Sequence, residues 1–306
     1  MKVSFEIPIN IDDKAQFQNA ASVRAMTRAL EDGGFDACHL TDHPAPTAKW
    51  RSAGGHDALD PFAALSFVAA MTTRLKLHTH IVVLPYRNPF VTAKAAATLD
   101  VLSEGRLILG VGGGYLRGEF AALGVDFDTR GAQMDVGIET MKAVWAGETV
   151  VRETPSFQAV GNMARPLPVQ QPHPPIWVGG NSDRAMRRAI ELGDGWSPFI
   201  TTPLVSKTTR TDDISDLAQL KAKIDKLREG LAARGRTGAF DITTPLAGGN
   251  EILRTASVQE LVDEAGALAE MGVTWTTAEA SCHDLAEHLN DVEWFAAKVL
   301  PQIHAL

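Results

Sequence analysis

The chain has 306 residues, of which 45% are hydrophobic and 22% are charged, a balance typical of a soluble globular protein. Its formal net charge of −8 and the lack of a basic run argue against nucleic acid as a partner and, less strongly, against anionic membrane surfaces. Because the chain has no apolar run of about 18 residues and no signal-peptide core, we expect a cytoplasmic protein. Free cysteines are usually buried, so we expect Cys38 and Cys282 to be buried free thiols.

Segments with the periodicity of strands alternate with segments that have the periodicity of helices. The expected strands cover residues 3–9, 35–40, 75–84, 107–111, 175–178, 195–199, 240–245 and 273–277. The expected helices cover residues 15–31, 61–71, 89–102, 132–146, 183–192, 216–234, 258–271 and 284–303. Eight such units predict parallel strands with crossover helices, and therefore an α/β fold, a closed (β/α)8 TIM barrel that forms one domain over residues 1–306.

The longer loops should lie at the two ends of this barrel. Four of them follow strands and belong at the catalytic end, over residues 44–59, 112–130, 200–215 and 246–257. A proline-rich passage over residues 150–175 follows a helix instead. We therefore expect it to form a short hairpin and an extended connector at the opposite end.

Asp42 and His43 end the second expected strand. A carboxylate beside an imidazole at the carboxyl end of a barrel strand can orient and tune a proton donor. The alternative is that Asp42 caps the turn and His43 is simply exposed.

His78 and His80 share one face of the third strand and could bind one metal ion. Such a site needs further ligands from later strand ends, and the remaining histidines do not lie there. We therefore expect no metal, and His80 should line the barrel mouth.

Two glycine-rich turns follow strands. The first starts at Gly110 but has Tyr115 where a dinucleotide-binding motif needs glycine, so it predicts either close approach of a ligand or a flexible loop. The second, Gly179-Gly180, opens a helix near Asp183, and free amides there could bind a phosphate. An ordinary capped turn is the alternative, and the charge of Asp183 would compete with an anion if it faced inward.

Five motifs together resemble the bacterial-luciferase-like oxidoreductases, in particular the branch that uses the deazaflavin coenzyme F(420). They are TDHP at 41–44, GGHDALDPF at 54–62, LPYRNP at 84–89, TLDVLSEGRLILGVGGGY at 98–115 and PPIWVGGNSDRAMRRAIELGDGW at 174–196. Each motif is weak alone, but their order and spacing are specific, and the likeness covers nearly the whole chain.

The resemblance implies a luciferase-like barrel with loop insertions, usually a homodimer, with the cofactor ring in the barrel mouth. Asp42 and His43 would face the ring and its reactive centre. The cofactor would also contact a bulge in the third strand and two glycine loops near its phosphate. In the family this bulge often has a cis peptide bond, which here would join His80 and Ile81. These positions are Thr79, His80, Ile81, Val82, Gly112, Gly113, Gly114, Gly179, Gly180 and Asn181.

The expected reaction is hydride transfer between coenzyme F(420) and a small organic substrate, with His43 as proton donor or acceptor and Asp42 setting its orientation. The expected substrate pocket consists of Glu6, Pro8, Trp50, Tyr115 and Trp196. Tyr115 stands where sugar-phosphate dehydrogenases of the family carry glutamate, which argues against glucose-6-phosphate as the substrate. Cations that could help an anionic cofactor to bind are Lys49, Arg51, Arg87 and Arg117.

Two other functions remain open at this point. An FMN-dependent monooxygenase would use the same barrel to activate oxygen. A barrel that binds a flavin or deazaflavin without turnover would keep the cofactor site and lack the chemistry.

Overall fold

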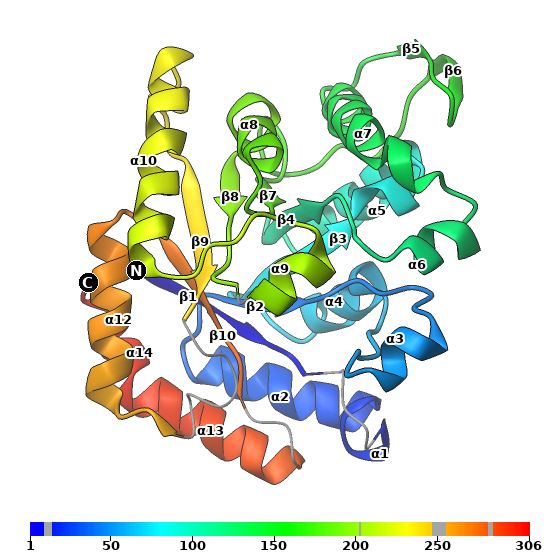
Figure 1. Ribbon diagram of the computed structural model, residues 1–306. Coiled ribbons are helices and arrows are strands. Elements are labelled where there is room, and N and C mark those ends of the chain that lie inside the picture. Colours follow the sequence, from blue (N-terminus) through cyan, green and yellow to red (C-terminus); the bar gives the residue numbers. More distant parts are fainter. Residues whose placement is uncertain (9–13, 202, 247–254, 281–283) are drawn as a thin grey trace.

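The computed structural model describes residues 1–8, 14–201, 203–246, 255–280 and 284–306, and it contains a closed barrel of parallel strands (Figure 1). Eight strands form the barrel, each hydrogen-bonded to its neighbour in the order in which they are named in the next sentence, and the last strand, β10, pairs with the first, β1. The strands are β1 (Lys2–Glu6), β2 (Ala37–Leu40), β3 (Lys76–Val83), β4 (Leu107–Gly112), β7 (Ile176–Gly179), β8 (Gly195–Ser197), β9 (Asp241–Pro245) and β10 (Trp275–Ala278). The predicted (β/α)8 barrel is confirmed.

Helices surround this barrel and begin where the sequence supplies caps. Asp60 and Asn88 each accept a hydrogen bond from the first turn of a helix that starts with proline, and Ser257 forms a capping box with Glu260. The principal helices are α2 (Ala20–Asp32), α4 (Pro61–Ala69), α5 (Pro89–Leu102), α7 (Arg130–Trp145), α8 (Asp183–Leu192), α10 (Leu217–Ala233), α12 (Val258–Glu270) and α13 (Leu285–Lys298). Within the described ranges, none of the helices is long and apolar enough to span a bilayer.

The first expected helix, over residues 15–31, is in fact two. A short α1 (Lys14–Phe17) ends before Asn19, whose side chain accepts a hydrogen bond from Ser22 N and so begins α2 as a new helix. The other short helices lie mainly in loops: α3 (Ala48–Ser52), η1 (Leu84–Tyr86), α6 (Arg117–Ala122), η2 (Phe127–Thr129), α9 (Pro203–Thr209) and α14 (Leu300–His304).

The proline-rich passage contains the expected hairpin, β5 (Val150–Glu153) with β6 (Gln158–Asn162). Its connector reaches the amino-terminal end of β4, where Gln170 Nε2 donates to the carbonyl of Leu107 and to Asp100. The expected position of this connector, opposite the catalytic end, is confirmed.

Side chains inside the barrel are separate from the main core between strands and helices. Ala37, Ile108, Trp177 and Trp275 form one buried cluster, as expected for residues that point inward from four strands. Cys38 points the other way into the main core and is a buried free thiol, as predicted. Cys282 lies outside the described residues.

Candidate active site

Strand β3 has the predicted bulge at the barrel mouth. Its pairing with β4 shifts register between Thr79 and Val82, and the His80–Ile81 peptide bond is cis. Thr79 Oγ1 donates to the carbonyl of Gly110 at 2.8 Å, which fixes the bulge against the neighbouring strand. The residues of the expected bulge are therefore at the expected place.

The side chain of Ile81 explains why two glycines end the adjacent strands. A Cβ atom at Gly112 would lie 2.1 Å from Ile81 Cδ1, and one at Gly179 would lie 2.8 Å from the same atom. Gly113 differs, because a Cβ there would meet nothing closer than Met134 Sδ at 4.0 Å. Gly112 and Gly179 thus make room for a protein side chain, whereas Gly113 leaves open space.

These three strand ends border one cavity of about 790 Å³. The cavity brings together Ile81, the Gly112–Gly114 loop and the Gly179–Gly180 turn, to which the family resemblance assigns the cofactor. Its volume lies within the usual range for a ligand pocket, about 300–1,000 Å³. The side chains on its wall include five arginines, Arg130, Arg184, Arg187, Arg188 and Arg210.

His43 is held by a carboxylate that the sequence analysis missed. Its Nδ1 lies 3.2 Å from Glu119 Oε2, and Glu119, on α6, is fully buried. Tyr86 Oη and the amide of Ala45 also donate to this carboxylate, at 2.8 and 3.1 Å. Burial alone would raise the pKa of Glu119, but the hydrogen bonds from His43, Tyr86 and Ala45 outweigh it and lower this pKa.

Asp42 does not orient His43, so that prediction is wrong. One carboxylate oxygen accepts from the amide of Val83 at 3.0 Å, and the other accepts from Arg87 at 2.9 Å. Burial raises the pKa of Asp42, although Arg87 opposes the shift. Asp42 therefore ties the end of β2 to the end of β3, because its two oxygens are occupied there.

Aromatic side chains surround His43. Its ring centroid lies 4.7 Å from that of Trp50, 4.8 Å from that of His56 and 6.1 Å from that of Tyr115. Gly55 makes this packing possible, because a Cβ there would lie 2.3 Å from the Trp50 ring. Two residues of the expected substrate pocket, Trp50 and Tyr115, are thus brought to the imidazole.

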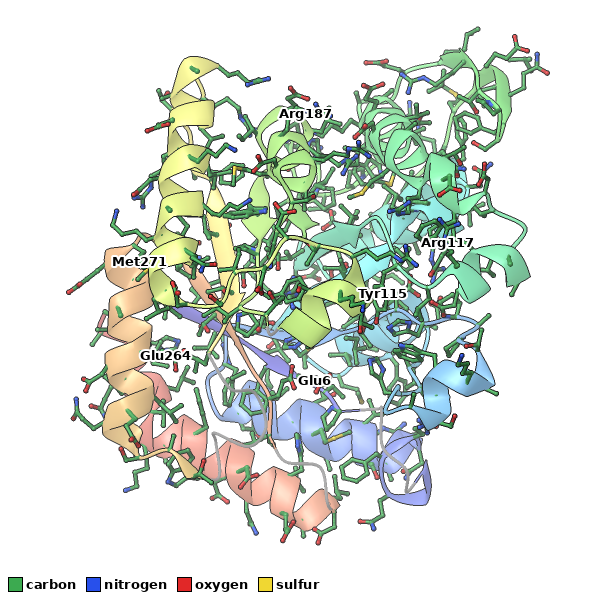
Figure 2. All side chains as sticks on the ribbon, viewed as in Figure 1. Glu6, Tyr115, Arg117, Arg187, Glu264 and Met271 are labelled. Carbon is green, nitrogen blue, oxygen red and sulfur yellow. The ribbon has the colours of Figure 1, made fainter. Side chains whose placement is uncertain are left out.

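Glu6 lies at the end of β1 and is buried. The register of β1 on β10 pairs Phe5 with Ala278, which places Glu279 beside Glu6 on the same face. Burial, and next the charge of Glu279, raises the pKa of Glu6 well above its ordinary value. Pro8, also buried, follows two residues later, so both expected pocket residues lie at the mouth end of β1. Figure 2 labels Glu6 together with Tyr115.

Three imidazoles lie inside the barrel below the mouth. The ring centroids of His39 and His78 are each 5.0 Å from that of His80, and Ser4 Oγ lies within hydrogen-bond distance of the first two rings. Burial lowers the pKa of all three, that of His80 to about 4. In the described part of the chain, no group of three or more histidine, cysteine or acidic side chains could hold a metal ion.

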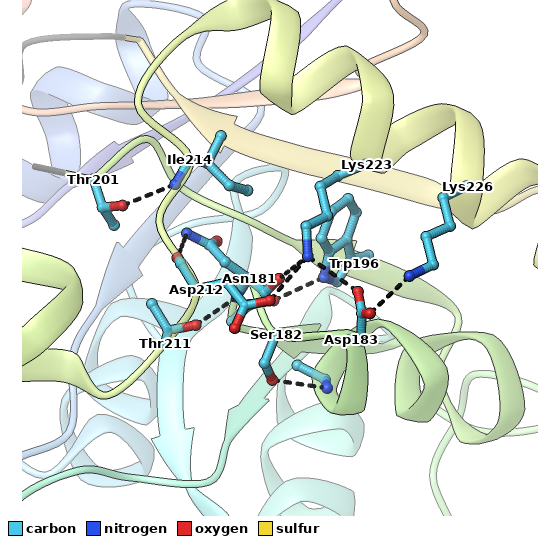
Figure 3. A network of polar contacts seen from close by, with 12 residues as sticks. Asn181, Ser182, Asp183, Trp196, Thr201, Thr211, Asp212, Ile214, Lys223 and Lys226 are labelled. Atoms are coloured by element: carbon cyan, nitrogen blue, oxygen red, sulfur yellow. Dashed lines mark hydrogen bonds and ion pairs between the residues drawn. The ribbon is translucent and has the colours of Figure 1, made fainter. Parts of the chain in front are cut away.

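Two predicted site residues have structural positions instead (Figure 3). Asn181 is fully buried, its Nδ2 donates to the carbonyls of Phe199 and Asp212, and its Oδ1 accepts from the amide of Phe199. Trp196 is fully buried and donates to the carbonyl of Gly180 at 2.9 Å. Neither side chain lines the cavity: Asn181 holds Phe199 and Asp212 in place, and Trp196 holds the Gly180 turn.

Asp183 faces away from the cavity. Its two oxygens accept from Lys223 and Lys226 of α10 at 3.0 and 2.7 Å, and these bonds lower its pKa (Figure 3). It therefore does not compete with an anion at the start of α8.

The positive charge at the mouth differs from that expected. Arg87 is bound by Asp42 and Asp60, and Arg51 is bound by Asp57, while Lys49 is exposed. Of the four cations that the sequence suggested, Arg117 is the one that lines a cavity in the part of the chain that the structure describes. The spacing of Arg184, Arg187 and Arg188 after the glycine turn is a signal that could have identified the cationic wall.

Comparisons with known proteins agree with this fold. A family model for luciferase-like monooxygenases matches residues 1–293. An uncharacterized protein from Mycobacterium tuberculosis is 31% identical over 291 residues, which cover 90% of this chain and 93% of that protein. The F(420)-dependent glucose-6-phosphate dehydrogenase of Kineococcus radiotolerans is 32% identical over 243 residues, which cover 77% of this chain and 66% of that enzyme. The structure of a monooxygenase, RslO1, from Streptomyces bottropensis has a TM-score of 0.79 at 21% identity and covers 100% of both chains.

Proposed function

The chain belongs to the luciferase-like monooxygenase family, a family of oxidoreductases, and we propose that its own reaction is hydride transfer between coenzyme F(420) and a small organic substrate. The observation that carries the proposal is the hydrogen bond between His43 and Glu119, because the His43 ring lies 6.1 Å from that of Tyr115, which with the β3 bulge borders the cavity of about 790 Å³. The 32% identity to an F(420)-dependent dehydrogenase supports the choice of cofactor.

The residues at the mouth fit a flat, anionic cofactor. Ile81 and Gly113 would contact the ring and its side chain, since the bulge projects into the cavity and Gly113 leaves open space beside it. Ser182 and Arg184 would hold the phosphate at the start of α8, where free amides and a guanidinium favour an anion, while Gly180, whose own amide donates to the carbonyl of Ser197, leaves room for it. When bound, the deazaflavin would supply the hydride carrier.

The protein's own contribution would be proton transfer and orientation. An ionised Glu119 can only accept hydrogen bonds, so Nδ1 of His43 carries the hydrogen and Nε2 is left for the substrate. Trp50 and Tyr115 flank the imidazole and would exclude water from the substrate. Glu6, whose pKa is raised by burial and by the neighbouring charge of Glu279, would hydrogen-bond to the substrate from the end of β1.

Paired fluorescence titrations with F(420) and FMN test the cofactor. We expect tighter binding of F(420), followed by anaerobic reduction or oxidation of the bound deazaflavin when substrates are screened. The FMN-dependent reaction is the second candidate, since the similar structure from Streptomyces bottropensis is that of a monooxygenase. Tighter FMN binding with oxygen consumption would replace our proposal, and tight F(420) binding without turnover on a broad panel would favour the non-catalytic binding protein.

We also propose that the enzyme is a homodimer, as its family resemblance implies. Sedimentation equilibrium at micromolar concentration should give twice the mass of the chain, and the mass of a single chain would contradict this.

A further inference from the structure

Three arginines that line the cavities, each from a separate element, gather on the ring of Phe127. The guanidinium carbons of Arg117, Arg130 and Arg210 lie 4.1, 3.8 and 5.2 Å from the centroid of Phe127. They come from α6, from the first residue of α7 and from the residue after α9. We call these four residues the Phe127 cluster.

The Phe127 cluster has more positive than negative charge. Arg117 pairs with Asp128 at 2.9 Å, whereas Arg130 donates to the carbonyl of Phe127 and, in the part of the chain that the structure describes, pairs with no carboxylate. Burial lowers the pKa of Arg130, and the neighbouring charge of Arg210 lowers it further. This local crowding of like charges is unfavourable, and a bound anion would offset it.

The backbone of Arg210 supports the same conclusion. This residue has a φ of 56° at the end of α9, where helices usually have glycine because other residues are disfavoured in this region. The chain nevertheless carries a guanidinium there, and it lines two cavities.

Those two cavities adjoin one another. The cavity of about 790 Å³ contains the proposed phosphate site as well as Arg130, and a second cavity of about 460 Å³ is lined by Arg117 and Lys207. Tyr115 and Arg210 line both. An anion with several charges could therefore extend from Ser182 past the Phe127 cluster into the second cavity.

We propose that the Phe127 cluster is a second anion subsite, which binds the carboxylates of the oligoglutamate tail that F(420) carries beyond its phosphate. The inference rests on the proposed function. FMN has a single phosphate and no such tail, so the same subsite would select F(420) over FMN.

The test compares two deazaflavins, F(420) with several glutamates and the same molecule with its phosphate but no glutamate. The wild-type protein should bind the tailed form about tenfold more tightly, the effect of two partly exposed charge pairs. The double variant Arg117→Gln/Arg210→Gly should lose this preference and bind the two forms with about the same affinity. Glycine suits the φ of residue 210, so the variant should fold, and thermal unfolding provides the check.

Arg24→Gln is the matched control, because its guanidinium lies 5.3 Å from the ring of Phe67 on α4, among the helices. It should keep the tenfold preference. Equal binding of the two deazaflavins by the wild type, or an unchanged preference in the double variant, would overturn the subsite and leave the proposed function standing. If the wild type binds neither deazaflavin, the proposed function fails, and the subsite fails with it.

Discussion

His43 and Glu119 form one unit, because the carboxylate fixes which ring nitrogen carries the hydrogen. Replacing His43 with alanine should lower kcat about a hundredfold or more while the dissociation constant of the cofactor stays the same. Steady-state kinetics and fluorescence titration would measure the two quantities. His304→Ala, which removes a surface imidazole paired with Asp36, is the control, and unchanged turnover of the His43 variant would exclude the proton-transfer role.

Glu119→Gln tests the partner without removing its volume. The amide can donate to Nδ1 and would favour the opposite tautomer of His43, so kcat should fall about tenfold and its pH profile should shift. The amide nitrogen then replaces Oε2, to which Tyr86 also donates, so Tyr86 has to turn its hydroxyl and accept instead, while the bond from Ala45 to Oε1 remains. A purely structural role would lower stability and leave the pH profile as it is.

At the scale of elements, β3, β4 and β7 meet on the side chain of Ile81. Gly112→Ala would place a methyl group 2.1 Å from Ile81 Cδ1, so we expect the free energy of unfolding to fall by about 1–3 kcal/mol. Denaturant titration would measure the change. Gly113→Ala, with 4.0 Å to its nearest neighbour, should cost much less. Adding Ile81→Ala should remove most of the penalty at Gly112, and no rescue would mean that another contact disfavours alanine.

Helix α13 carries a buried histidine that should make the protein acid-sensitive. Both ring nitrogens of His288 have no hydrogen-bond partner among the described residues, and burial lowers its pKa to about 4. Below the unfolded pKa, about 6.5, the unfolded chain binds a proton that the folded chain does not, so stability is lost as the pH falls toward 4.

His288→Leu removes this titration. Between pH 7 and pH 5, the variant should lose about 2 kcal/mol less free energy of unfolding than the wild type. Urea titrations at the two pH values would measure both losses. His39, His78 and His80 are present in both proteins and shift the curves equally, so identical losses would show that His288 is protonated in the folded state.

The periodicity of the chain was enough to predict the barrel, because each strand and helix depends on local patterns.

The prediction for Asp42 was wrong because its partner, Arg87, lies 45 residues later, and adjacency to His43 suggested a contact that the backbone does not make. Glu119 was missed because it reaches His43 from 76 residues away, through a helix that follows the glycine loop. Trp196 is buried because its ring packs in the main core and its Nε1 donates to the carbonyl of Gly180, contacts that the sequence does not reveal.

At the scale of the whole molecule, the net charge of −8 and the cationic mouth act on an anionic cofactor in opposite directions. The Debye length is about 10 Å at 0.1 M salt, so the charge of the surface as a whole is largely screened while contacts at the mouth are screened less. The arginines should therefore determine the sign of the salt effect.

We expect the affinity for tailed F(420) to fall about fivefold between 50 mM and 500 mM sodium chloride, and to fall less for the tail-less form. Fluorescence titrations at several salt concentrations would measure the slope. The Arg117→Gln/Arg210→Gly variant should have a shallower slope than the wild type, because fewer cations contact the ligand. An affinity that rises with salt would mean that repulsion from the acidic surface dominates, and that the arginines of the mouth do not face the bound cofactor.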